Sequence, residues 1–332
     1  MIKKYLHPIV LLSIVILITA CGRGGEGQTS KSSFIGGTEA VVSNYEPDSP
    51  PAEVTDDSYS FKVVLKLENK GETKISKSDI DIRLVGINPS YFGVTQDKLM
   101  NLKPDDDLNP KMRDGNGNII DGAPTFVTIP SGNDYFKAVP FSGNQDFKVR
   151  ADICYKYKTI ANARLCILKN FINVDGTEIC NPSEETTIFS SGSPVQFTNF
   201  RESVAGKDTI NFFFDVVHSG NGDIYEVNSA AGTSQCPRDD PIRRAKEDRI
   251  KVSVDVGEDF KSVLNCPALE GSTLGNPVGF IKLSSGKRSI MCTLKLSEVQ
   301  HSSDFTNIVT ITGEFNYDDN KETSFLVKHL TS

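Results

Sequence analysis

The strongest constraint on the fold is the alternation of apolar and mostly polar residues in the segment 60–75, SFKVVLKLENKGETKI. Phe61, Val63 and Leu65 occupy every second position, which is the pattern of a strand with one buried face. The sequence Asn69-Lys70-Gly71 follows, and glycine accepts the positive φ that tight turns require. The segment therefore predicts a half-buried β-strand that ends at a turn.

This pattern occurs twice in the chain. The segment 209–224, TINFFFDVVHSGNGDI, aligns with 60–75 without a gap at an offset of 149 residues. A second pair of segments, 153–167 and 313–327, aligns without a gap at an offset of 160 residues. Because both alignments keep the same order along the chain, we predict two copies of one β domain.

Short alternating segments with Gly, Pro, Asn and Asp between them fill most of the remaining chain, and helical periodicity is nearly absent. We predict an all-β fold with two tandem antiparallel Ig-like β-sandwich domains, at 38–170 and 194–332, joined by a polar linker at 171–193. Tyr157 and Tyr317 occupy equivalent positions. Each suits a tyrosine-corner contact, with its ring in the core and its hydroxyl on the backbone, or a plain half-buried aromatic.

The start of the chain has the pattern of a signal peptide. Lys3 and Lys4 precede an apolar run over 9–18, and small residues precede Cys21, so residues 1–20 are expected to be removed on export. The apolar run is shorter than the roughly 20 residues that span a bilayer.

Residues 18–21, Ile-Thr-Ala-Cys, resemble the lipobox of prokaryotic lipoproteins. That resemblance implies a lipidated Cys21 at the new N-terminus, which would hold the protein at the extracytoplasmic membrane surface. Residues 21–37, rich in Gly and Ser, would then form a flexible tether. The alternative is an ordinary signal peptide with a chance cysteine.

Composition describes a folded, mildly acidic chain, with 24% charged residues, no Trp and a net charge of −7. The most basic segment, 241–251, alternates its charges, so a nucleic-acid surface is not expected. The expected partners are the membrane, through the lipid, and an envelope protein or glycan.

Six cysteines remain once Cys21 is assigned to lipid, and an even number in an exported chain favours disulfides. The segments around Cys154 and Cys166 are expected to form a hairpin that places both thiols on one face, which predicts a bridge between them. Cys266 and Cys292 form a second predicted pair, and Cys180 and Cys236 remain as a third. Free or rearranged thiols are the alternative for each pair.

An alternating strand followed by Asn/His-x-Gly resembles the CARDB-type and related Ig-like domains of prokaryotic surface proteins. The layout also resembles uncharacterised exported proteins of small-genome archaea, through FIGGT at 34–38, CYKYKT at 154–159 and GSPV at 192–195. The resemblance implies a fold and a location. It implies no functional residue other than Cys21.

Patterns for catalysis or metal binding are weak. His218, His301 and His329 lack zinc-site spacing, and GRGGEG at 22–27 lacks the strand and helix of a dinucleotide site, so we predict no cofactor and no metal. The polar segment 103–124 offers two interpretations, a hairpin turn or a calcium loop. Its candidate calcium ligands are Asp114, Asn116, Asn118 and Asp121, with Ile119 and Thr125 where an EF-hand has Gly and Glu.

From the sequence we therefore expect a non-enzymatic surface lipoprotein that acts in adhesion, binding or scaffolding. Two alternatives remain. An accessory subunit of a secretion or filament assembly would pair an exposed edge strand with its partner. A surface hydrolase or carbohydrate-active protein would need a pair of carboxylates in a cleft.

Overall fold

Antiparallel strands dominate the structure, which is a computed structural model describing residues 32–56, 58–172, 178–183, 186–227, 236–299 and 303–330. The prediction of an all-β, sandwich-type fold is confirmed. Residues Phe34–Ser332 form one unit, and the description below concerns that unit.

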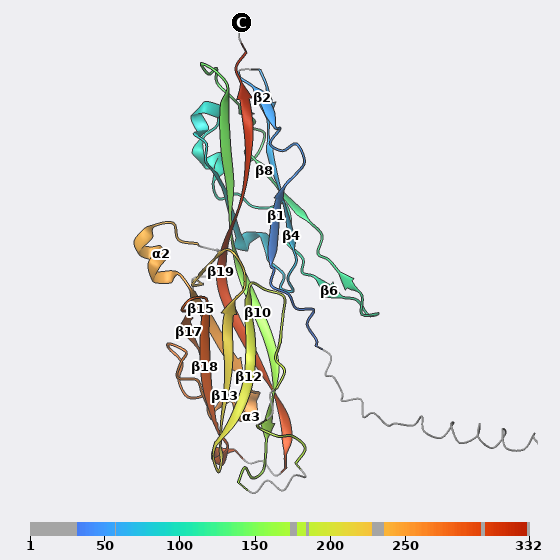
Figure 1. Cartoon of the computed structure of the whole chain (residues 1–332), viewed down its shortest axis with the longest axis vertical. Coiled ribbons are helices and arrows are strands. Elements are labelled where there is room, and N and C mark those ends of the chain that lie inside the picture. The colour runs from blue at the N-terminus through green and yellow to red at the C-terminus, as the bar shows by residue number, and fades with distance from the viewer. Residues whose placement is uncertain are drawn as a thin grey trace, which may run out of the picture. The chain divides into compact units, whose positions relative to one another are not determined.

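Two long strands form the centre of the unit. β10 (Gln145–Ile167) and β19 (Phe305–Lys328) run antiparallel and pair without interruption, from Gln145 opposite Val327 to Ile167 opposite Phe305. Figure 1 shows them side by side, β10 in green and β19 in red. Their pairing joins residues that the sequence analysis assigned to two different domains.

Further strands extend this central ladder into a sheet, and two other sheets accompany it. The ladder sheet adds β2 (Glu53–Thr55), β5 (Ile80–Val85), β11 (Phe189–Ser190), β14 (Asp223–Tyr225), β15 (Arg249–Asp255) and β17 (Val278–Lys282). One accompanying sheet has the order β1 (Val41–Tyr45), β4 (Val63–Asn69), β8 (Thr125–Ile129). The other has the order β12 (Val195–Gly206), β13 (Thr209–His218), β18 (Lys287–Lys295), β16 (Leu264–Asn265).

The remaining elements are short. Two small hairpins pair β3 (Ser60–Phe61) with β9 (Phe136–Lys137) and β6 (Met112–Arg113) with β7 (Ile119–Ile120). Helical segments are α2 (Asp240–Lys246), α3 (Glu258–Lys261) and the 3-10 turns Lys77–Asp79, Pro89–Phe92, Gln96–Leu99 and Leu296–Glu298.

The ladder relates the two sequence repeats to each other. Lys156 and its equivalent 160 residues later, Asn316, pair directly, so equivalent strands run antiparallel across this point. The flanking strands follow the same relation: Asp152 of β10 pairs with Arg83 of β5, and the equivalent Thr312 of β19 pairs with Ser253 of β15. The ladder therefore has a local pseudo-twofold symmetry centred on Lys156 and Asn316.

β19 contributes to the core of the first repeat. The ring of Phe325, from β19, lies 5.3 Å from Phe61 and 5.8 Å from Phe92, and it stacks on Phe147 at 5.6 Å. All three partners precede residue 170, and Phe325 is buried. Aromatic pairs of this kind stabilise a core beyond the burial of their area.

Tyr157 and Tyr317 make the contact expected of a tyrosine corner. The buried Tyr157 hydroxyl accepts the N–H of Thr73 (3.2 Å) and donates to the carbonyl of Gly192 (3.0 Å). The Tyr317 hydroxyl accepts the N–H of Gly222 at 2.7 Å. Since Gly222 follows Thr73 by the 149 residues of the first alignment, the two repeats use the same contact.

The predicted hairpin between Cys154 and Cys166 is wrong, because both residues lie on the single strand β10. At about 3.3 Å per residue they are about 40 Å apart, too far for a disulfide. Alternate burial continues through Tyr157, Thr159 and Ala161, where no turn interrupts the strand.

The observed bridges are Cys154–Cys236, Cys166–Cys180 and Cys266–Cys292. Only the last agrees with the predicted pairing. The predicted Cys180–Cys236 bridge is wrong as well: Cys180 closes a short loop onto the end of β10, whereas Cys236 attaches its segment to the middle of that strand.

The predicted linker at 171–193 contains ordered structure near its end, where β11 pairs with Ala161 and Asn162 of β10. The ladder joins the ranges 38–170 and 194–332 within one unit. Their division into two domains therefore stays a prediction.

We predict that Gly71→Ala destabilises the protein, because an added Cβ would lie 2.0 Å from the Tyr157 hydroxyl and 2.7 Å from the Gly192 carbonyl oxygen. Overpacking of this kind costs about 1–3 kcal/mol of unfolding free energy, measurable by urea denaturation. Gly143→Ala is the matched control, since nothing lies within 4 Å of its added Cβ. Equal stability of the two variants would contradict the proposed contact.

Candidate functional site

A polar pocket of about 380 Å³ lies on the outer face of the ladder, beside its centre. β10 and β19 supply residues for its floor, while β5, β14 and the segment 236–243 with the start of α2 supply residues around it. Its volume lies within the range of small-molecule sites. The lining residues are Arg83, Arg150, Asp152, Asn221, Gly222, Asp223, Tyr225, Pro237, Arg238, Arg243, Asp318, Asp319 and Asn320.

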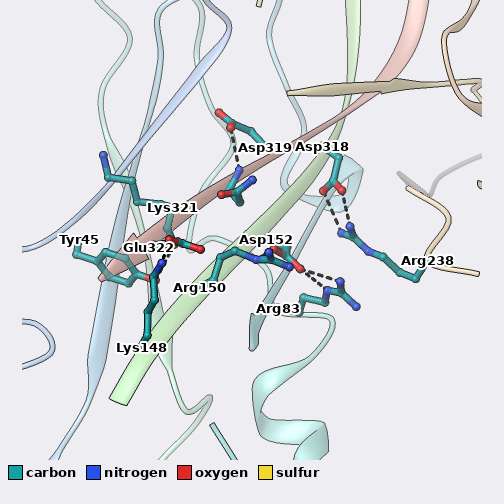
Figure 2. A network of polar contacts seen from close by, with 11 residues as sticks. Tyr45, Arg83, Lys148, Arg150, Asp152, Arg238, Asp318, Asp319, Lys321 and Glu322 are labelled. Atoms are coloured by element: carbon teal, nitrogen blue, oxygen red, sulfur yellow. Dashed lines mark hydrogen bonds and ion pairs between the residues drawn. The ribbon is translucent and has the colours of Figure 1, made fainter. Parts of the chain in front are cut away.

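The first charged cluster in the pocket centres on Asp152, whose side chain is only 3% exposed. Arg83 reaches one carboxylate oxygen through Nε and Nη2, both at 2.7 Å, and Arg150 donates through Nε to the other oxygen at 2.7 Å. Figure 2 shows both guanidinium groups beside this carboxylate. The alternation of β10 directs Asp152 and Arg150 to the outer face, while Val149 and Ala151 enter the core.

The second cluster pairs Asp318 with Arg238 (Figure 2). The two terminal nitrogens of Arg238 donate to the two oxygens of Asp318, and the Nη2–Oδ1 distance is 3.0 Å. Such two-pronged contacts fix orientation as well as charge. The Cys154–Cys236 bridge holds the backbone two residues before Arg238 against β10, next to Asp318, which pairs with Cys154 in the ladder.

Burial affects the acids of the site. It raises the pKa of Asp318, as do the neighbouring carboxylates Asp152 and Asp223, while Arg238 acts in the opposite direction. Burial also raises the pKa of Asp319, although the N–H of Asn320 and the charge of Lys321 oppose that rise. These acids lie in a partly desolvated region where charge interactions are stronger than in water.

Other polar contacts border the site along the ladder. Lys148 and Glu322 form an ion pair across the two strands, and the Tyr45 hydroxyl donates to the carbonyl of Lys321 at 3.1 Å (Figure 2). Burial raises the pKa of Tyr45 to about 12. These contacts connect β1 with the ladder beside the pocket.

The other half of the ladder makes the equivalent backbone pairing without these charges. The positions equivalent to the first cluster surround the same backbone pairing but carry only uncharged side chains. They are Ser253 for Arg83, Thr310 for Arg150 and Thr312 for Asp152. A strand ladder of this geometry therefore forms without the ion pairs, and the charges distinguish one half of the molecule from the other.

The sites proposed from sequence lie elsewhere. Cys21 falls outside the described residues, so its lipidation stays a prediction. In the segment 103–124 the hairpin interpretation holds: Asp114 Oδ1 accepts the N–H groups of Asn116 (2.9 Å) and Asn118 (2.8 Å), and β6 pairs with β7. Asp121 forms ion pairs with Lys70 and Lys111.

The described histidines do not form a common site. The ring of His218 lies beside the hydroxyl of Tyr317 at 3.4 Å, and His329 Nδ1 lies 2.8 Å from Asp56. Within the described ranges, no group of three or more His, Cys, Asp or Glu residues could hold a metal ion.

Sequence reasoning missed the pocket because its residues are far apart in the chain. One available signal was the repeat alignment itself. Extended by one residue, it matches Asp152 with Thr312, a charged position that only one copy carries, and it matches Asp318 with Lys158, where the sign of the charge is reversed.

Neither a protein-family model nor a curated protein matches this sequence. In the part of the chain that the structure describes, every helix is too short or too polar to cross a membrane.

The symmetry leads to a stability prediction. The variant Arg83→Ser/Arg150→Thr/Asp152→Thr carries the residues of the other repeat, and we expect its unfolding free energy to stay within about 1 kcal/mol of the wild type, since replacing buried ion pairs is often neutral. Arg83→Ser/Arg150→Thr leaves the buried Asp152 carboxylate without these two cations and should lose about 3 kcal/mol. Urea denaturation measures both, and a triple variant less stable than the double variant would contradict the prediction.

Proposed function

We propose that this chain is an exported protein of the cell envelope, attached to the membrane surface through a lipid on Cys21, that binds a partner molecule in the central pocket without transforming it. The single observation that carries the proposal is the charged cluster around Asp152, which the equivalent half of the ladder lacks. Charges that the fold does not need are candidates for recognition.

Location and architecture fit this proposal. The six cysteines of the described residues are paired in three disulfides, which is typical of an oxidising, extracytoplasmic compartment. We assign the two halves around the ladder to two tandem Ig-like sandwiches of the CARDB type. Rigid strands position binding residues more accurately than loops do, and the pocket takes its floor from such strands.

The contacts of the acids favour binding over hydrolysis. A glycosidase of the common type needs one carboxyl that gives up a proton and a second that acts as nucleophile or base. Asp152 and Asp318 are the acids that arginines hold in the pocket: Arg83 and Arg150 bind the two oxygens of Asp152, and Arg238 binds those of Asp318. We therefore assign them the role of orienting guanidinium groups.

One observation favours the second candidate function, an accessory subunit of an assembly. The hairpin of β6 and β7 exposes three apolar side chains, with Met112 at 50%, Ile119 at 53% and Ile120 at 49% exposure. Exposed apolar residues that lie together are a common feature of protein contacts.

The two functions are separated by a capture experiment with the full chain in lipid vesicles and solubilised envelope from its own source. We expect the triple variant of the Asp152 cluster to lose at least tenfold in captured material, while Met112→Ser/Ile120→Ser captures as the wild type does. The reverse result would support the assembly function. Captured polymer that shortens with time would contradict a purely binding role.

A further inference from the structure

The acids and bases of the pocket are arranged in two layers. The carboxylates of Asp152 and Asp318 are 3% and 12% exposed, whereas the side chains of Arg83, Arg150 and Arg238 are between 25% and 43% exposed. At these two clusters a molecule entering the pocket therefore meets the guanidinium groups before the carboxylates, whereas Asp223, which also lines the pocket, is exposed. Carboxylates behind the arginines hold the guanidinium groups in place before a ligand arrives.

Arg150 retains hydrogen-bond donors for such a molecule. It contacts Asp152 through Nε, and its two terminal amino groups make no hydrogen bond with another described residue. A guanidinium edge presents parallel N–H groups that match the two oxygens of a carboxylate. The two terminal amino groups of Arg150 thus suit a planar oxyanion such as a carboxylate.

The charge balance of the pocket disfavours a polyanionic ligand. Four arginines and four aspartates line it, so its formal charge is zero before binding. The chain as a whole carries −7. A ligand with one negative charge is accommodated more easily here than a phosphate or sulfate polyanion, which would need excess positive charge.

The rim of the pocket adds neutral donors and acceptors. The side-chain amides of Asn221 and Asn320 line the pocket and make no hydrogen bond with another described residue, and Asp223 offers acceptors beside them. Pro237 adds a small apolar surface. A ligand with neighbouring hydroxyl groups on a compact ring and one carboxylate would pair with these donors and acceptors.

From these contacts we infer that the pocket binds a hexuronic acid residue of an acidic glycan, with the sugar carboxylate on the free edge of Arg150 and the sugar hydroxyls toward Asn221, Asn320 and Asp223. The inference rests on the proposed binding function and specifies its ligand class. Nothing in it requires a covalent step.

Titration calorimetry of the full chain in detergent micelles tests the inference, with methyl glucuronide as the probe and methyl glucoside and glucose 6-phosphate as comparisons. We expect the uronide to bind at least tenfold more tightly than the neutral sugar and more tightly than the phosphate. Arg150→Thr, which introduces the residue of the other repeat and leaves the contact between Arg83 and Asp152, should weaken uronide binding tenfold or more. Thr310→Ala, at the equivalent position, is the matched control and should bind as the wild type does.

Three results would overturn the inference: equal binding of the neutral sugar, tighter binding of the phosphate, or unchanged binding in Arg150→Thr. If the uronide fails to bind while the pocket variant still abolishes capture of envelope material, the ligand class is wrong and the binding function stands. If the pocket variant captures normally, the proposed function itself fails.

Discussion

Pairing between β10 and β19 is the interaction on which the other elements of the structure depend. The two strands exchange backbone hydrogen bonds from Gln145 to Ile167, and nearly every neighbouring strand attaches to one of them. Because β19 carries residues of the second repeat into the core of the first, the first repeat does not bury its apolar face alone. Phe325 in the aromatic cluster of the first repeat is the clearest case. Ladders formed by distant segments close a long loop, and the burial they make possible must offset that entropy.

The candidate site follows from the same ladder. Pairing of β10 with β19 and with β5 brings residues near 83, 150 and 320 to one outer surface. The Cys154–Cys236 bridge adds the segment that carries Arg238. Pseudo-symmetry then gives an internal comparison that most proteins lack. Where one half has Arg83 and Asp152, the other has Ser253 and Thr312 on the same pairing. The same backbone pairing thus carries either set of side chains, and we propose recognition as the reason for the charged set.

Local patterns in the sequence predicted local features well. Alternation predicted the strands, and the two alignments placed Tyr157 and Tyr317 at equivalent positions with a tyrosine corner as one of two interpretations. A hairpin turn was likewise one of the two interpretations of the segment around Asp114. The errors concern long-range pairing. The segments around Cys154 and Cys166 were expected to be two strands of a hairpin with both thiols on one face, yet the inward alternation through Thr159 and Ala161 continues as one strand. Which distant strand pairs with which is decided by tertiary packing, and for that reason the pocket could not be predicted either.

Native-state hydrogen exchange under increasing denaturant tests the central claim most directly, because it measures the opening free energy of each ladder amide. If the ladder unites both halves, the amides of β10 and β19 on the two sides of Lys156 and Asn316 will share one opening free energy, equal to that of global unfolding. Two groups of amides, divided at Lys156 and opening with clearly different free energies, would contradict the account and indicate two independent domains.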